Sequence, residues 1–158
     1  MKTFFTADQH FGHSNILKYC NRPFKDVEEM NATLIQNWNS VVSDNDEVFV
    51  LGDFALCKPP EMAAIFKQLN GARKILIRGN HDRSIRQMLE VGFHEVHSKL
   101  EWKGWTLQHH PPEDTNRKTL CGHVHQNWVR KGWTVNVGVD VWNFKPVASE
   151  NLLTAVQS

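Results

Sequence analysis

The sequence has few cysteines, and none of them are spaced as a CxxC pair. Cys20, Cys57 and Cys121 lie far apart and are odd in number, which fits reduced thiols better than a disulfide framework. We therefore expect a cytoplasmic protein. The apolar N-terminus is too short for a signal peptide, and no stretch reaches the roughly 20 apolar residues of a membrane-spanning helix. We expect no insertion into a membrane.

An excess of either charge is also missing, because 18 Lys and Arg stand against 17 Asp and Glu, for a net charge of +1. This balance provides no strong electrostatic footprint for long nucleic acid. Linkers rich in Pro, Gly or Ser and low-complexity segments are absent, so the sequence contains no domain boundary. With 158 residues, of which 41% are hydrophobic, we expect one globular domain over residues 1–158.

Short β-rich runs alternate with helical periodicity in the first half of the sequence. Asp26 and Glu29 have the spacing of a capping box at the start of one predicted helix. This alternation is typical of an α/β domain, which gathers ligands at the carboxyl ends of its strands. The predicted elements are the strands Thr3–Ala7, Glu47–Leu51 and Lys74–Ile77 and the helices 26–41, Pro59–Leu69 and Ser84–Val91.

The second half of the sequence favours β-hairpins. Segments 101–108 and 129–136 each contain Lys-Gly-Trp-Thr, at 103–106 and 131–134, with Lys-Gly expected at the turn. The pattern occurs only twice, so we expect similar turn geometry and not a repeat array. Tryptophans this numerous are more often core residues than base-stacking residues.

Histidine is abundant, and six of the nine histidines fall in short polar strings. Asp8 and His10 are two residues apart, so both point to one side if this stretch is extended, and the same holds for His123 and His125. Mixed nitrogen and oxygen ligands suit Mn, Fe, Zn, Co or Ni, and seven ligands are too many for one tetrahedral ion. The candidate ligands are Asp8, His10, Asp53, Asn80, His109, His123 and His125.

Two divalent ions that share a carboxylate resolve this count, and such pairs are known to catalyse displacement at phosphorus. Two ions, two aspartates and a bridging hydroxide would leave a charge of about +1, which attracts an anionic phosphate oxygen. The hydroxide would then serve as the nucleophile. The ligand set therefore predicts phosphoester hydrolysis.

These strings, in their order along residues 8–125, resemble the signature of the calcineurin-like metallophosphoesterase superfamily. The resemblance implies a four-layer αββα sandwich, with two mixed β-sheets flanked by helices and a dinuclear site at one end of the strands. It also implies two divalent transition-metal ions, with Mn favoured over Fe, Zn, Co and Ni. By the family pattern one ion is held by Asp8, His10 and His125, the other by Asn80, His109 and His123, and Asp53 bridges them.

Several residues near the ligand strings receive roles by the same resemblance or by chemistry. His81 matches the family's histidine that protonates the leaving oxygen or steadies the phosphate, and Asp82 could orient it. His109 is taken as the ligand, although the neighbouring His110 leaves this choice open. His13 and Arg22 could bind a phosphate oxygen of the substrate, but helix capping and loop structure explain them equally well.

The sequence departs from the family's protein phosphatases, because Phe54-Ala55-Leu56 follows Gly52-Asp53 and Asp82 follows Asn80-His81. The chain resembles the compact, uncapped bacterial and phage members. We expect a phosphodiesterase for small nucleotide-like phosphoesters. The alternatives are a nuclease acting on ends or single strands and a catalytically idle protein-binding module. The natural substrate, the preference for monoester or diester, the native metal and the oligomeric state stay open.

Overall fold

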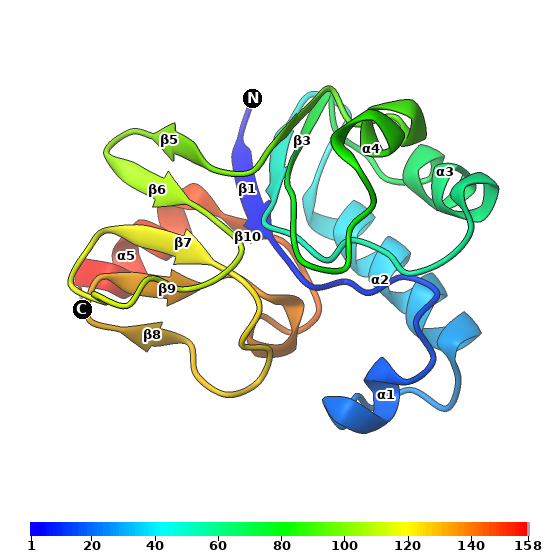
Figure 1. Ribbon diagram of the computed structural model, residues 1–158, viewed down its shortest axis with the longest axis horizontal. Coiled ribbons are helices and arrows are strands. Elements are labelled where there is room, and N and C mark those ends of the chain that lie inside the picture. The colour runs from blue at the N-terminus through cyan, green and yellow to red at the C-terminus, as the bar shows by residue number, and fades with distance from the viewer. Residues whose placement is uncertain (158) are drawn as a thin grey trace.

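The computed structural model describes residues 1–157, which form two five-stranded sheets and five α-helices (Figure 1). The first sheet has the strand order β10-β1-β2-β3-β4, in which β1 to β4 are parallel and β10 is an antiparallel edge strand. Its strands are β1 (Thr3–Thr6), β2 (Glu47–Val50), β3 (Arg73–Ile77), β4 (Glu95–His97) and β10 (Val147–Ala148).

The second sheet has the order β5-β6-β7-β9-β8, with three parallel central strands between two antiparallel edges. Both sheets are therefore mixed. Its strands are β5 (Leu100–Trp102), β6 (Trp105–Leu107), β7 (Thr119–Cys121), β8 (Arg130–Lys131) and β9 (Thr134–Asn136).

The helices begin where the sequence supplies caps. Asp26 accepts a hydrogen bond from the Glu29 N–H at 2.8 Å, but the Glu29 carboxylate binds the N–H of Lys25, so the predicted capping box is half formed. Ser84 and Gln87 form a complete box at the next capped helix. The helices are α1 (Ile16–Tyr19), α2 (Val27–Val41), α3 (Pro59–Lys67), α4 (Ile85–Val91) and α5 (Ser149–Gln157), with a 3₁₀ turn η1 at Val139–Val141.

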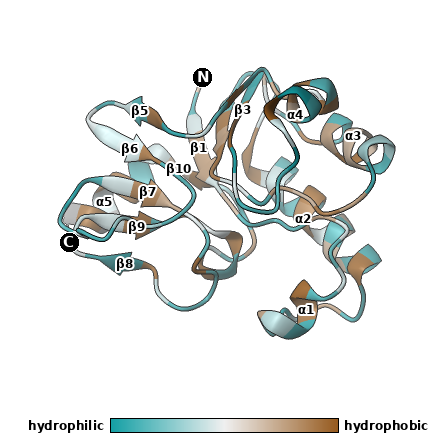
Figure 2. Ribbon diagram, viewed as in Figure 1, coloured by the Kyte–Doolittle hydropathy of each residue, from teal (hydrophilic) through white to brown (hydrophobic). Residues whose placement is uncertain are grey.

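The first sheet is buried on both faces, which is why its strands are nearly continuous apolar runs (Figure 2). Val48 and Leu76 face the cluster formed with α2, α3 and α4, whereas Phe49 and Ile75 face the second sheet. Helix α5 packs Leu152 into this inter-sheet cluster. The predicted αββα arrangement, two mixed sheets flanked by helices, is confirmed. None of the helices within residues 1–157 has the length and apolar character needed to cross a membrane.

Both predicted hairpins form, but their turns differ. In β5–β6 the turn residues are Lys103 and Gly104, whose φ angles of 46° and 85° suit a type I′ turn. In β8–β9, Lys131 pairs with Thr134, so the turn shifts to Gly132 and Trp133. The expectation of similar turn geometry was wrong, because strand pairing and not the local sequence sets the register.

Candidate metal centre

The predicted ligands come from loops at the carboxyl ends of five parallel strands, where parallel sheets place their binding sites. Asp8, Asp53 and Asn80 follow β1, β2 and β3, and His109 and His123 follow β6 and β7. Backbone hydrogen bonds join these loops: Asp8 N–H to Gly52 O (3.0 Å), His10 N–H to Asp53 O (3.1 Å) and Gly122 N–H to His109 O (2.9 Å). The two sheets thus contribute to one site.

The ligand loops are not extended, contrary to the prediction for Asp8 with His10 and His123 with His125. Residues with a left-handed backbone conformation bend the chain at these positions, and the side chains still come together. The backbone strain is about 1–3 kcal/mol for each such residue. Hydrogen bonds hold these conformations, for example from the His123 N–H to Asp8 Oδ2 at 2.8 Å. Positive φ angles occur at Asp8 (60°), His10 (53°), Asp53 (52°), His123 (73°) and His125 (49°).

The first group of ligand atoms belongs to Asp8, His10 and His125, which all lie within 4.8 Å of one another. Asp8 Oδ1 and His10 Nε2 are 3.9 Å apart, both are buried, and neither makes a hydrogen bond. Burial raises the pKa of Asp8 to about 6 and lowers the pKa of His10 to about 4, so His10 is neutral near physiological pH. A divalent cation would satisfy both buried atoms.

The second group centres on His109. Its Nδ1 lies 2.8 Å from the Leu51 carbonyl oxygen, which can only accept, so Nδ1 carries the proton. Its Nε2 lies 3.0 Å from Asn80 Oδ1 and 3.3 Å from Asp53 Oδ2. Burial alone would lower the pKa of His109, but the hydrogen bond to Asp53 outweighs burial and raises it. A divalent metal that displaced the Nε2 proton would find one nitrogen and two oxygen atoms converging here, a donor set that fits such an ion.

Asp53 lies between the two groups. Its Oδ2 is 3.5 Å from His10 Nε2 and 3.3 Å from His109 Nε2. Burial alone would raise the pKa of Asp53, but its interactions with His10 and His109 outweigh burial and lower the pKa well below its usual range. An ionised carboxylate therefore faces both groups, in the position expected of a shared ligand.

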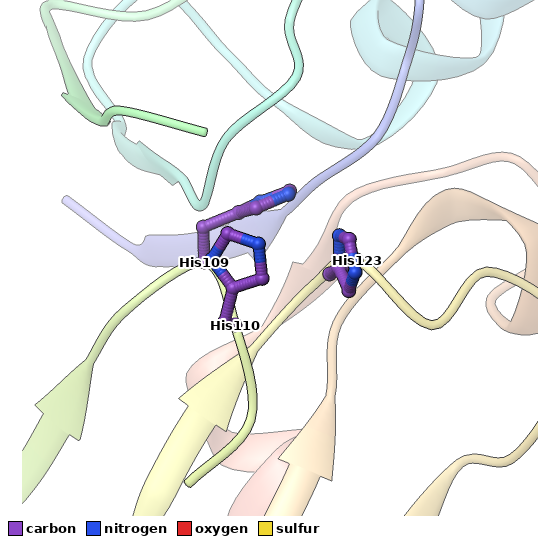
Figure 3. A group of neighbouring side chains, drawn as sticks. All are labelled: His109, His110 and His123. Carbon is purple, nitrogen blue, oxygen red and sulfur yellow. The ribbon is translucent and has the colours of Figure 1, made fainter. Parts of the chain in front are cut away.

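The neighbouring residues His109 and His110 have different surroundings. His109 is 3% exposed and lies against Asp53 and Asn80, whereas His110 is exposed and its ring centroid is 4.2 Å from that of His123. Figure 3 shows the three rings converging from the loops after β6 and β7. The geometry favours His109 as the ligand that faces Asp53.

His81 and Asp82 do not act as a pair. The Asp82 carboxylate accepts the N–H groups of Gly79 (2.7 Å), Asp53 (2.8 Å) and Phe54 (2.9 Å), so it joins the loops after β2 and β3. The expectation that it orients the His81 ring was wrong, because backbone donors occupy it. His81 is exposed, and its ring centroid is 5.6 Å from that of His10.

The two predicted substrate-binding residues have different surroundings. His13 lines a cavity of about 530 Å³ together with His10, His81 and His125. Arg22 is buried, and its guanidinium donates to the Asp140 carboxylate and to the carbonyl oxygens of Asp8 and Gln9. This position does not support a direct role for Arg22 in substrate binding, because its donors are used within the chain.

Asp140 is a residue that sequence reasoning missed. Its Oδ2 is 3.1 Å from His125 Nδ1. Burial alone would lower the pKa of His125, but the hydrogen bond to Asp140 outweighs burial and raises the pKa to about 10. Asp140 stands alone between two valines beyond the ligand strings, so the only signal for it is an acidic residue in an apolar stretch.

The chain is similar to several known proteins. The family model of calcineurin-like phosphoesterases matches residues 1–153. An uncharacterized protein of Methanocaldococcus jannaschii is 38% identical over 171 residues, which cover 99% of this chain and 92% of that protein. The gene 66 protein of Mycobacterium phage L5 is 39% identical over 82 residues, which cover 51% of this chain and 39% of that protein.

Among solved structures, a protein of unknown function from Aquifex aeolicus matches with a TM-score of 0.76 and 27% identity over 98% of both chains. The fold of this chain is therefore shared along its whole length with that protein. The family model covers nearly the entire sequence, and the chain has groups of side chains that can hold metal ions. The chain therefore belongs to the calcineurin-like phosphoesterase family, whose members hydrolyse phosphoesters with divalent metals.

Proposed function

We propose that the protein is a phosphodiesterase that uses two divalent metal ions, Mn foremost, and acts on small nucleotide-like substrates. The observation that carries this proposal is the convergence of His10 Nε2, which has no hydrogen-bond partner, and His109 Nε2 on the single carboxylate of Asp53. Two ions bound there would supply Lewis-acid polarisation of a phosphoryl group and an activated water for in-line displacement.

The residues assigned to each ion follow the two groups of ligand atoms. Asp8, His10 and His125 would hold the first ion, and their ligand atoms lie within 4.8 Å of one another. Asn80, His109 and His123 would hold the second, with Asp53 shared. The distances from His109 Nε2 to Asn80 and Asp53 support the second assignment.

His13 gains a defined proton position from its contact with His10. The two Nδ1 atoms are 3.1 Å apart, so one of them must donate. When His10 uses Nε2 as a ligand, its Nδ1 carries the proton and donates to His13 Nδ1. A neutral His13 then carries its own proton on Nε2, as a donor to a phosphate oxygen in the cavity that it lines.

The cavity walls support a diester with a nucleotide-like group. Tyr19 is 71% exposed and offers a ring face for stacking, and Asn15, Gln126 and Asn127 offer carboxamides to the edge of a base. No lysine or arginine is among the described residues that line this cavity. A dianionic monoester would favour such a cation, whereas a monoanionic diester requires less positive charge.

The proposal is tested with metal-stripped protein reloaded with Mn and assayed on bis-p-nitrophenyl phosphate and p-nitrophenyl phosphate. We expect turnover only with metal, and a kcat/KM for the diester at least about tenfold above that for the monoester, a difference of about 1.4 kcal/mol in activation free energy. A preference for the monoester would contradict the diester assignment. Folded protein that is inactive on both esters with Mn, Fe, Zn, Co and Ni would favour a protein-binding module.

Replacing His81 with Ala should lower kcat by roughly 10²–10⁴-fold, the usual contribution of a general acid, without loss of bound metal. The backbone N–H of residue 81, which donates to Asp53 Oδ1 at 2.9 Å, is kept in this variant. Because p-nitrophenolate leaves without much help from an acid, the loss should be larger for a diester with an alcohol leaving group.

The matched control for this prediction is His94→Ala, which removes an exposed histidine whose Nδ1 accepts the Lys74 N–H near the opposite end of β3. The measurements are steady-state kinetics on bis-p-nitrophenyl phosphate and on a diester with an alcohol leaving group, and metal content by mass spectrometry. An equal loss for both leaving groups would exclude His81 as the proton donor.

A further inference from the structure

We propose that Asp140 and Arg22 form a buried relay with His125 that positions this imidazole and makes the first metal site the tighter-binding of the two. The inference rests on the metal assignment in the proposed function. It adds two positioning residues, and an order of metal binding, that the ligand strings do not contain.

The relay begins with a side-on ion pair inside the protein. Arg22 Nε donates to Asp140 Oδ1 and Arg22 Nη2 donates to Asp140 Oδ2, both at 3.0 Å. The two side chains are 0% and 3% exposed. Two parallel bonds between planar groups fix the orientation of the carboxylate more firmly than one bond would.

Asp140 passes this orientation on to His125. Its Oδ2 lies 3.1 Å from His125 Nδ1, and an ionised carboxylate only accepts, so Nδ1 carries the proton. With Nδ1 holding its proton, Nε2 is the atom at which a metal ion would displace the other proton and bind, next to Asp8 and His10. Asp140 thereby sets both the ring orientation and the tautomer of His125.

Arg22 also fixes the loop that carries the other ligands of the first group. Its Nη2 donates to the Asp8 carbonyl oxygen at 2.6 Å, and its Nη1 donates to the Gln9 carbonyl oxygen at 2.8 Å. One guanidinium therefore holds the backbone at Asp8 and, through Asp140, the ring of His125. This common support makes the first group more preorganised than its separate side chains would be.

The ligand imidazoles differ in what their second nitrogen contacts. His125 faces the carboxylate of Asp140, His10 faces the imidazole of His13, and His109 faces the carbonyl oxygen of Leu51. A carboxylate partner increases the basicity of a ligand histidine more than a neutral partner does. The relay should therefore strengthen the first site and leave the second site, with His109, unaffected.

Cys20, His125 and Asp140 also have ligand atoms within 4.8 Å of one another, which raises the question of a third metal site. The contacts argue against it. Both oxygens of Asp140 are already bonded to Arg22, and the buried guanidinium charge beside them opposes a further cation. Asp140 therefore acts through His125 and not as a ligand.

The test titrates metal-free protein with Co²⁺ and Mn²⁺, followed by calorimetry and by the visible absorption of bound Co²⁺, with no substrate present. The wild type should bind two ions in two resolvable steps. In Asp140→Asn the tighter step should weaken by roughly 10–100-fold, the typical cost of losing a partner of a ligand histidine, while the weaker step is unchanged. The Co²⁺ spectrum of the first equivalent should also change.

Two further variants keep the result interpretable. Asp46→Asn removes another buried carboxylate, which accepts from the Lys2 and Ser43 N–H groups before β2, and it should leave both binding steps intact. Arg22→Lys keeps the charge but loses the two-bond geometry, and it should weaken the same step as Asp140→Asn by a smaller factor.

Equal weakening of both steps, or a lower melting temperature with unchanged affinities in Asp140→Asn, would overturn the relay. Binding of two ions without phosphodiester turnover would contradict the proposed function and leave the relay standing. A wild-type protein that binds neither ion would overturn both.

Discussion

Replacing Asp53 with Asn should remove at least one equivalent of bound metal and lower phosphodiester turnover by on the order of 10³-fold or more. Asp53 Oδ2 is the one carboxylate oxygen that lies within 3.5 Å of both His10 Nε2 and His109 Nε2 among the described residues. The amide keeps the size of the side chain but loses the negative charge that offsets two divalent ions. We expect this variant to have the largest effect of any single ligand.

The effect must be separated from a loss of folding. Asp53 Oδ1 accepts the His81 N–H at 2.9 Å, a bond that the Asn oxygen can still make. The control variant is Asp46→Asn. Asp46 directly precedes strand β2, whereas Asp53 follows it, so this variant should keep full activity. Metal content, melting temperature and turnover are measured on all three proteins. Folded Asp53→Asn that retains two metals and more than a tenth of the activity would contradict the assignment of Asp53 as the shared ligand.

Much of this site is predictable because it depends on strand ends. Apolar runs locate β1, β2 and β3, and the polar residues that follow them, Asp8, Asp53 and Asn80, must meet at one edge of a parallel sheet. The order of the strings adds the family resemblance and with it the αββα fold. These features are local in sequence or follow from topology, so one sequence is enough.

The unpredicted parts depend on contacts between distant residues. Arg22 and Asp140 are 118 residues apart, and nothing in their local sequences pairs them. The same holds for the His123 N–H and Asp8 Oδ2, 115 residues apart, a bond that helps to hold Asp8 and His123 in left-handed conformations. The sequence pattern predicts that the chain stays extended where a strand ends. Hydrogen bonds between distant residues instead stabilise left-handed conformations there.

The last prediction concerns Gly52, which precedes Asp53 in the loop after β2. Its φ is +96°, and an added Cβ would collide with the His109 ring, including Nδ1 and Cγ, and with the backbone of Gly79. Gly104, in the β5–β6 turn, has a similar φ of +85°, but no atom lies within 4 Å of an added Cβ. Both glycines have a positive φ that disfavours other residues, but only at Gly52 would a side chain also collide with neighbouring atoms.

Gly104→Ala should therefore cost about 1 kcal/mol of unfolding free energy, the strain of a left-handed alanine, and lower the melting temperature by about 2–4 °C. Gly52→Ala should cost on the order of 3–5 kcal/mol and lower it by about 10 °C, because the His109 ring must leave its hydrogen bond with Leu51. Only Gly52→Ala should also weaken metal binding at His109. If calorimetry found equal destabilisation and unchanged metal affinity in both variants, Gly52 would serve the backbone alone. A larger effect confined to Gly52→Ala would mean that the missing side chain at residue 52 makes room for a metal ligand.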